Sequence, residues 1–273
     1  MGQIEFWKMH GSGNDFILID NRDGSVAEEK MGLLVERACR RRESIGADGV
    51  IFITNSDNYD FAWRFFNADG GEVEMCGNGG RCAARFAHLK GIAGKSMTFE
   101  TLAGPISAEI MDRVVKVLMP VPSGLSTDMD MSFMPGWISV DFINTGVPHV
   151  VVQVEGIRDH PVLEQGRDIR YHPMFSPAGT NANFMSVKGP DFIEVRTYER
   201  GVEHETLACG TGAIASALIA NVRGMVSSPV RVATKGGEEL RIYFNKEGES
   251  LRKVYLEGST SIVCQGKLHD EAL

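Results

Sequence analysis

The sequence lacks the features that direct a chain to a membrane, out of the cell or onto nucleic acid. No apolar run approaches the roughly 18 residues that a membrane-spanning helix needs. The N-terminus has no cationic stretch followed by an apolar one, so we expect no signal peptide and a cytoplasmic protein. The 28 Lys and Arg residues are outnumbered by 36 Asp and Glu, for a net charge of -8. We therefore expect no nucleic acid and no membrane as partner.

The common metal and cofactor motifs are missing as well. Short Cys-x-x-Cys pairs are absent, and His204-Glu205 is not followed by the second histidine of a zinc-protease helix. Gly11-Ser12-Gly13 is followed by Phe16 where a dinucleotide fingerprint has glycine. There is no Gly-Lys-Ser/Thr phosphate loop. We expect no metal and no cofactor, although the lysines leave a Schiff base with pyridoxal phosphate (PLP) open.

Cysteine is scarce, and its five copies are an odd number in a chain without an export signal. This favours reduced thiols in the cytoplasm over a disulfide framework. We interpret Cys39, Cys82 and Cys264 as small buried apolar residues, which is the common role of a single cysteine. With 273 residues and 43% apolar content, the chain has enough material for one large globular domain or two of ordinary size.

The remaining two cysteines, Cys76 and Cys209, lie in two copies of one pattern. The segments CGNGG (76–80) and CGTGA (209–213) begin it. A basic residue and a glycine follow 14 and 15 positions after each cysteine, and a threonine and a glycine follow 25 and 28 positions after it. Several agreements in phase indicate a duplicated unit rather than chance.

Each copy has the same expected local structure. Aromatic and β-branched residues at 59–66 and 192–198 predict a strand before each cysteine. Small and apolar residues at 83–87 and 214–220 predict a helix after it, and the second helix is apolar nearly all round and should be buried. We predict an α+β protein with two similar halves, each a curved, mostly antiparallel sheet wrapped around a central α-helix. The halves are 1–118, to which 264–273 returns, and 119–263.

Two cysteines at equivalent helix starts suggest proton transfer to and from a carbon centre. Inversion of such a centre needs a base on one face and an acid on the other, and a duplicated chain can supply one residue to each. Unpaired N–H groups and the positive end of the helix dipole lie beside each thiol, where they would favour a thiolate and bind a carboxylate. Two thiols that share one site resist double ionisation, which leaves one thiolate and one thiol. Packing at the helix start is the alternative interpretation.

Five segments resemble the diaminopimelate epimerase family, in order and through nearly the whole chain: MHGSGNDF (9–16), FNADG (66–70), CGNGGRC (76–82), YERG (198–201) and ACGTG (208–212). The resemblance implies a PLP-independent enzyme that converts LL-diaminopimelate to the meso form in lysine and cell-wall precursor biosynthesis. It also implies two pseudo-symmetric β-barrel-like domains, assembled as a homodimer.

The resemblance further implies roles for individual residues. Cys76 and Cys209 would be the proton acceptor and donor, and His149 and Glu199 would tune the pKa values of their thiols. The α-carboxylate would bind at the two helix starts, to Gly77, Asn78, Gly210 and Thr211. The ammonium and distal groups of the substrate would contact Asn14, Asn67, Asn181, Glu199 and Arg200. Without the resemblance, His149 would be interpreted as a packed strand-end residue, Glu199-Arg200 as a surface ion pair and the asparagines as turn formers.

Two positions depart from some members of the family, and other functions stay open. Val147 and Gly49 stand where those members have asparagine and glutamine near the substrate, which affects distal recognition but not the cysteine chemistry. A second two-thiol enzyme, similar to proline racemase, is one alternative. A non-catalytic thiol or metal-binding protein is another.

Overall fold

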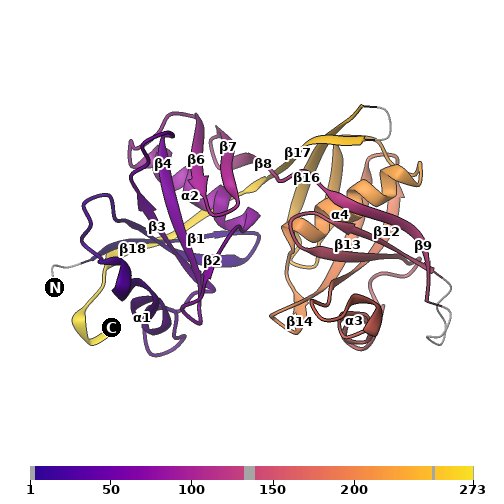
Figure 1. Cartoon of the computed structure of the whole chain (residues 1–273), viewed down its shortest axis with the longest axis horizontal. Coiled ribbons are helices and arrows are strands. Elements are labelled where there is room, and N and C mark those ends of the chain that lie inside the picture. Colours follow the sequence, from indigo (N-terminus) through magenta and orange to yellow (C-terminus); the bar gives the residue numbers. More distant parts are fainter. Residues whose placement is uncertain (1–3, 132–138, 248–249, 273) are drawn as a thin grey trace. The chain divides into compact units, whose positions relative to one another are not determined.

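The computed structural model describes residues 4–131, 139–247 and 250–272. The chain divides into two compact units: Met1–Val117 with Gly258–Leu273, and Leu118–Glu257. The predicted halves, 1–118 with 264–273 and 119–263, stay a prediction. Figure 1 shows that the strands of each unit curve around one helix, α2 (Gly77–Leu89) in the first and α4 (Gly210–Val222) in the second. The expected fold class, α+β with two barrel-like sheets around central helices, is confirmed.

The first unit opens with an antiparallel hairpin and then crosses over. Strands β1 and β2 are antiparallel, and α1 carries the chain from β2 to the parallel strand β3. Strand β4 pairs with β3, β5 and β6, and β7 and β8 continue the meander. The remaining elements are β1 (Glu5–Gly11), β2 (Asn14–Asp20), α1 (Glu28–Ala38), β3 (Gly49–Thr54), β4 (Phe61–Asn67), β5 (Glu72–Val73), β6 (Ser96–Thr101), β7 (Gly104–Met111), β8 (Val114–Leu118), β18 (Ser261–Lys267), which pairs with β1, and the short 3-10 helix η2 (Asp270–Ala272).

The second unit repeats this order of elements and pairings. Strands β10 and β11 form the antiparallel hairpin, α3 leads to the parallel strand β12, and β13 pairs with β12, β14 and β15. Its elements are β9 (Ser123–Asp130), β10 (Ser139–Asn144), β11 (Pro148–Gln153), α3 (Val162–Arg170), the 3-10 helix η1 (Pro173–Phe175), β12 (Asn181–Gly189), β13 (Phe192–Glu199), β14 (His204–Thr206), β15 (Val230–Thr234), β16 (Glu239–Glu247) and β17 (Ser250–Ser259). The duplication expected from the sequence is therefore a duplication of topology.

The signals that predicted the two helices act as expected at both ends. Cys76 and Cys209 are the N-cap residues of α2 and α4, and both have extended backbone dihedrals. Lys90 and Arg223 are the C-caps, and the glycine after each has a positive φ, 70° at Gly91 and 73° at Gly224. Glycine adopts this left-handed conformation without a Cβ clash, so it ends both helices at the same point.

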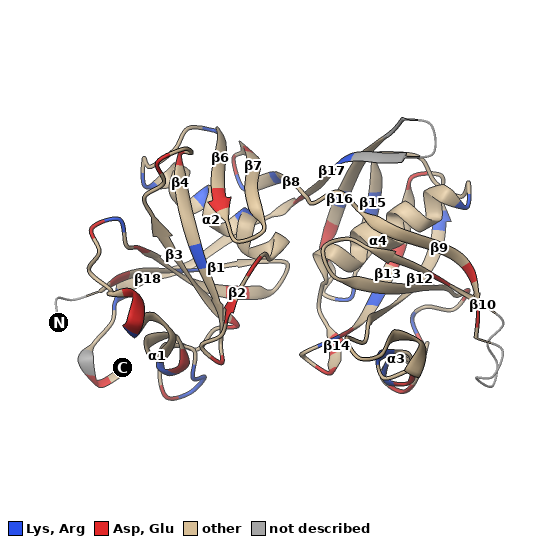
Figure 2. Ribbon diagram, in the orientation of Figure 1, with Lys and Arg blue, Asp and Glu red and all other residues tan. Residues whose placement is uncertain are grey.

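The two helices differ in what they bury. Figure 2 shows α4 without a charged residue, and nearly all of its side chains are buried, as the sequence predicted. Helix α2 instead carries Arg81 and Arg85, and Arg81 is fully buried. Among the described residues, no helix has the length and apolar character needed to cross a membrane.

The expectation that the other three cysteines are buried holds for two of them. Cys39 and Cys82 are buried, and burial raises the pKa of the Cys39 thiol to about 12, so it stays protonated and unreactive. Cys264 is exposed on β18, and the prediction for it is wrong. Its strand lies along β1 with most of its side chains exposed, and residue type alone could not show that.

Candidate active site

Each candidate catalytic cysteine presents its thiol beside the first turn of a helix. The carbonyl of Cys76 accepts the first helical hydrogen bond from the N–H of Gly80 at 2.8 Å, and the carbonyl of Cys209 accepts one from Ala213 at 2.9 Å. The N–H groups of residues 77–79 and 210–212 therefore have no acceptor within their own helices. Gly77 and Gly210 open the two helices and are both buried. This arrangement suits the binding of a carboxylate and the stabilisation of a thiolate.

Cys76 is half-buried next to two of the predicted binding residues. Its Sγ donates to Oδ1 of Asn14 at 3.6 Å, a distance within reach of a sulfur donor. The amide of Asn78 donates to the same Oδ1 at 3.3 Å. The Asn14 amide nitrogen donates to Oδ2 of Asp48 at 2.7 Å. The structure thus brings Cys76, Asn14 and Asn78 together and adds Asp48.

Asp48, which accepts the hydrogen bond from Asn14, belongs to an ion-pair cluster that the sequence did not predict. Arg41 bridges Asp15 at 2.6 Å and Asp48 at 2.9 Å, and Lys8 pairs with Asp15 at 2.8 Å. Burial opposes ionisation of Asp15, but the hydrogen bonds and charges of Arg41 and Lys8 outweigh it and lower its pKa to about 2. Asp15 belongs to the segment 9–16 that carries the family resemblance, and this membership was the one sequence signal that could have pointed to the cluster.

Arg81 supports the first turn of α2 from inside the unit. Its Nη2 donates to the hydroxyl of Ser12 at 2.7 Å and to Oδ1 of Asn78 at 3.0 Å. Gly11 leaves room for it, because a Cβ at that position would lie 3.1 Å from the guanidinium. The buried guanidinium therefore holds the side chain of a predicted carboxylate-binding residue in place.

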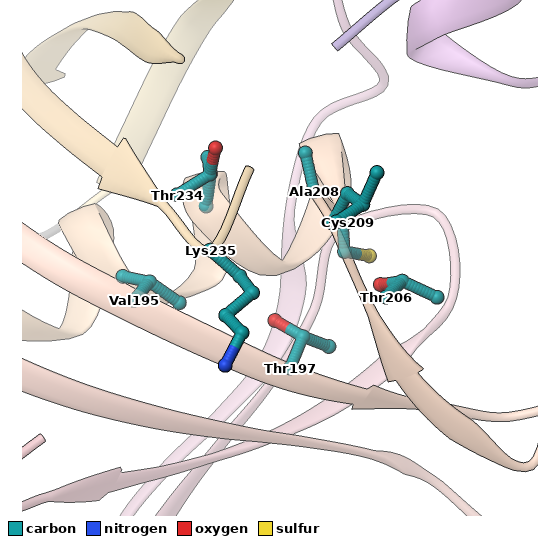
Figure 3. A pocket seen from close by; sticks show the side chains of 9 residues that line it. Val195, Thr197, Thr206, Ala208, Cys209, Thr234 and Lys235 are labelled. Carbon is teal, nitrogen blue, oxygen red and sulfur yellow. The ribbon is translucent and has the colours of Figure 1, made fainter. Parts of the chain in front are cut away.

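Cys209 is more buried than Cys76 and has a different neighbour. Only 8% of the residue is exposed, and its Sγ lies 3.5 Å from the hydroxyl of Thr211. Figure 3 shows Cys209 at a small pocket of the second unit. The pocket is lined by Val195, Thr197, Thr206, Leu207, Ala208, Cys209, Ala213, Thr234 and Lys235. Thr211, a predicted carboxylate-binding residue, is thus near the thiol.

His149 lies on β11 in a fully buried polar row. Its Nδ1 lies 3.1 Å from the amide nitrogen of Asn183, whose Oδ1 accepts from the hydroxyl of Thr197 at 2.9 Å. Burial, with a smaller contribution from the charge of Arg200, lowers the pKa of His149 to about 3. The imidazole is therefore neutral at pH 7. Its Nε2 is buried and has no hydrogen-bond partner among the described residues.

The remaining predicted binding residues lie at strand ends. Asn181 is buried at the start of β12, where it donates to the carbonyl of Pro148 and accepts from the N–H of Arg200, both at 2.9 Å. Arg200 follows β13 and donates to the carbonyl of Ala178 at 3.0 Å. Glu199 ends β13 and is half-buried. Asn67 ends β4 and is exposed, and no described contact joins it to Cys76 or Asn14.

Gly49 and Val147, the two residues that depart from the family pattern, lie at the start of a strand and in a turn between two strands. Gly49 is the first residue of β3, and a Cβ there would lie 2.5 Å from the backbone oxygen of Phe66, so the strand pairing excludes a side chain. Val147 lies in the turn between β10 and β11, and its carbonyl accepts from the N–H of Thr145 at 3.2 Å. In the described ranges, no group of three or more His, Cys, Asp or Glu side chains is placed to hold a metal ion.

The chain is similar to known proteins in its sequence and in its fold. The pattern of the family described as "Diaminopimelate epimerase" matches residues 6–123 and 142–263. The "Diaminopimelate epimerase" of Aquifex aeolicus is 47% identical over 99% of either chain. Among solved structures, the Bacillus anthracis phenazine biosynthesis protein of the PhzF family has a TM-score of 0.78 at 16% identity, covering 98% of this chain and all of that one. A probable proline racemase from Agrobacterium radiobacter has a TM-score of 0.70 at 16% identity, covering 98% of this chain and 93% of its own; both structures show the fold alone.

Proposed function

The chain belongs to the diaminopimelate epimerase family, and from this premise we propose that Cys76 and Cys209 are its acid and base. The protein is an isomerase that converts LL-diaminopimelate to the meso form in lysine biosynthesis. The observation that carries the assignment is that both cysteines cap the helix that follows the same strand hairpin in the two repeats. No other pair of cysteines in the described residues has equivalent positions.

The proposed chemistry is a proton transfer across one carbon. A thiolate removes the α-proton from one face, and a thiol delivers a proton to the other face. The N–H groups at Gly77 and Asn78, and at Gly210 and Thr211, bind the α-carboxylate and stabilise the charge that develops on it. A helix end contributes up to ~2 kcal/mol, or roughly one and a half pKa units, at about 1.36 kcal/mol per unit. Exclusion of water must supply the rest of the activation.

The distal part of the substrate would contact a second group of residues. Arg200 suits the distal carboxylate because a guanidinium pairs with it bidentately. Asn181 already fixes the backbone at Arg200, so it would orient this group as well as bind. We propose that Asn14, Asn67 and Glu199 complete the contacts to the ammonium and distal groups. His149 and Glu199 would tune the thiols, and the neutral imidazole would act as a dipole rather than as a charge.

Three further properties are proposals. The enzyme needs no PLP, because two thiols already provide the acid and the base. It works in the cytoplasm, where thiols are kept reduced. It forms a homodimer, for which the exposed apolar residues Ile262 and Val263 of β18 offer a surface. We propose no nucleic acid and no membrane as partners, in keeping with the net charge of -8.

Incubation of the purified protein with LL-diaminopimelate, without added PLP, tests the function. Proton NMR should show the meso isomer forming while an absorbance scan shows no bound PLP. A panel with proline and other amino acids separates the related two-thiol racemase, which would prefer the smaller substrate. Tightly held stoichiometric zinc with no turnover would instead support a metal-binding protein.

A further inference from the structure

We propose that Asp48 is a positioning residue: it orients the Asn14 amide so that Cys76 rests as the thiol, which leaves Cys209 as the resting thiolate. The inference rests on the proposed function, because it assigns the two roles that the two-cysteine reaction requires. Asp48 lies outside the segments that carry the family resemblance and directly before Gly49. Its carboxylate reaches the site only because β2 and β3 run side by side.

The orientation of the Asn14 amide follows from Asp48. A carboxylate that pairs with Arg41 at 2.9 Å can only accept hydrogen bonds. The group that faces it at 2.7 Å must therefore be the NH2 of Asn14 and not the carbonyl oxygen. The backbone N–H of Asp15 donates to the same Oδ2 of Asp48 at 3.1 Å and holds the carboxylate in this position. One end of the amide is thus fixed by charge.

The other end of the amide determines the state of Cys76. With its NH2 on Asp48, Asn14 presents Oδ1 to the sulfur at 3.6 Å and to the Asn78 amide at 3.3 Å. An amide oxygen has lone pairs and no proton, so it accepts from an S–H group and repels a thiolate. A hydrogen bond to the neutral form disfavours ionisation. Cys76 is therefore held protonated.

Cys209 has the opposite kind of neighbour. The Thr211 hydroxyl, 3.5 Å from its sulfur, can donate to an anion, which an amide oxygen cannot. Both sulfurs lie at the start of a 13-residue helix, so the dipole acts on each of them alike. The difference between the two thiols thus comes from their side-chain partners.

The charged groups around the two sulfurs do not reverse this order. In the first unit, Asp15 and Asp48 are balanced by Arg41 and Lys8, Glu72 is paired with Arg64, and Arg81 adds one cation. In the second unit, Glu205 is paired with Arg196 and Lys235, which also leaves one cation in excess, and His149 is neutral. The neighbouring segments also carry His10 of β1, Glu74 before Cys76, Glu199 at the end of β13 and Arg200 directly after it. With Glu74 counted, these groups carry no net charge in the first unit and one positive charge in the second, so charge does not oppose a thiolate at Cys209.

The assignment has a consequence for the reaction. The resting enzyme is ready for the stereoisomer whose α-hydrogen faces Cys209, and Cys76 donates the proton from the other face. After one turnover Cys209 holds the proton taken from the substrate and Cys76, which gave its proton to the product, is the thiolate. Solvent exchange must reset both thiols before the next turnover in the same direction. Asp48 sets this resting state without contact with the substrate.

The test is the pH dependence of iodoacetamide labelling of each cysteine in the full-length reduced protein. Cleavage after Arg64 and Arg81 isolates Cys76, and cleavage after Arg200 and Arg223 isolates Cys209, so mass spectrometry can follow both. At pH 7 we expect Cys209 to react roughly tenfold faster than Cys76, as for about one pKa unit. Asp48→Asn frees the Asn14 amide to turn its NH2 to the sulfur and should accelerate Cys76 roughly tenfold, with Cys209 unchanged.

Asp15→Asn is the matched control. It removes one negative charge from the same Arg41 cluster but leaves the Asp48–Asn14 bond, so Cys76 labelling should change by less than roughly threefold. If Asp48→Asn does not fold, Asn14→Ala removes the acceptor and should also accelerate Cys76. Faster labelling of Cys76 than of Cys209 in the unaltered protein, or equal effects of the two aspartate variants, would overturn the inference. Epimerisation is measured in parallel on the unaltered protein. Normal epimerisation with a contrary labelling result overturns only the role of Asp48, whereas absent epimerisation counts against the proposed function.

Discussion

Helices α2 and α4 begin and end alike, yet their surroundings differ. Each starts at a cysteine N-cap and ends before a glycine with φ near 70°. Helix α2 carries the buried Arg81, and its cysteine faces the amide oxygen of Asn14. Helix α4 has no charged residue, and its cysteine faces the hydroxyl of Thr211. The repeated backbone places two thiols in the same local geometry, while the side chains that diverged can give them different roles.

The comparison extends to the hairpin that precedes each cysteine, where an arginine on the first strand pairs with a glutamate on the second. Arg64 on β4 binds Glu72 on β5 through two bonds of 2.7 Å, and Arg196 on β13 binds Glu205 on β14 at 2.6 and 2.8 Å. The second pair is more buried: its side chains are 13% and 11% exposed, against 27% and 25% for the first. The same interaction should therefore stabilise the two halves to different degrees.

Removal of either thiol should have the largest effect. Cys76→Ala and Cys209→Ala should each reduce epimerisation by at least roughly 10³-fold, because one of the two proton-transfer groups is lost. The variant that keeps Cys209 should still exchange the α-hydrogen of one isomer with heavy water, since the remaining base can return a proton to the same face. NMR measures both rates, and circular dichroism checks the fold. Turnover within tenfold of normal in either variant would contradict the assignment.

The buried ion pair should give the next largest effect, on stability. Glu205→Gln should lower the free energy of unfolding by about 3 kcal/mol, because Arg196 is left buried without its carboxylate. Glu72→Gln should cost only about 1 kcal/mol at its more exposed site. Urea unfolding of the two variants measures both values. Equal losses would show that burial does not distinguish the pairs.

The Glu205 pair also predicts a pH dependence. Burial opposes ionisation of Glu205, but Arg196 and Lys235 outweigh it, so its pKa is lowered from the ordinary 4.5. The stabilisation is therefore complete above pH 4.5 and is lost as the pH falls through the lowered value. Glu205→Gln should remove this part of the acid sensitivity, and urea titrations at several pH values would detect the change.

Equivalent glycines in the two helices sharpen the contrast further. A Cβ at Gly212 would lie 2.2 Å from Oδ1 of Asn183, whereas the nearest atom to one at Gly79 is the end of the Ile51 side chain at 3.2 Å. Gly212→Ala should destabilise by roughly 2–3 kcal/mol through overpacking. Gly79→Ala should change stability by less than about 1 kcal/mol, because the gain in helix propensity offsets the tight contact. Thermal unfolding of both variants would reveal similar losses if the helices were packed alike.

His149 should have an effect on stability that is confined to acid pH and vanishes at pH 7. It begins the parallel pairing with β12, where the first unit has the apolar Phe16. Burial lowers its pKa from 6.5 to about 3, so stability is complete above pH 6.5 and falls as the unfolded chain binds a proton below it. The expected loss is about 2 kcal/mol at pH 5. His149→Gln should abolish this contribution, and an unchanged profile between pH 7 and 5 would contradict it.

The sequence was most informative where the repeat and local rules agreed. The cysteine N-caps, the C-terminal glycines and the apolar α4 follow from spacing and helix signals, and all three appear in the structure. The Asp48–Asn14–Cys76 chain could not be predicted, because it depends on the register between β2 and β3 across 34 positions of sequence. The prediction that Cys264 is buried was wrong, because the exposed face of a strand cannot be recognised from one residue. The Arg196–Glu205 pair was missed, although their cross-strand spacing in a short hairpin was a usable signal.

The most direct test of the two-thiol account is the early fate of deuterium when LL-diaminopimelate reacts in heavy water. Because one thiolate removes the proton and a different, solvent-exchanged thiol delivers the new one, the first meso product should carry deuterium at the inverted carbon. The remaining LL substrate should carry almost none. Meso product that retains the original hydrogen, or deuterium that enters the LL substrate as fast as the product, would show that a single base serves both faces and would contradict the account.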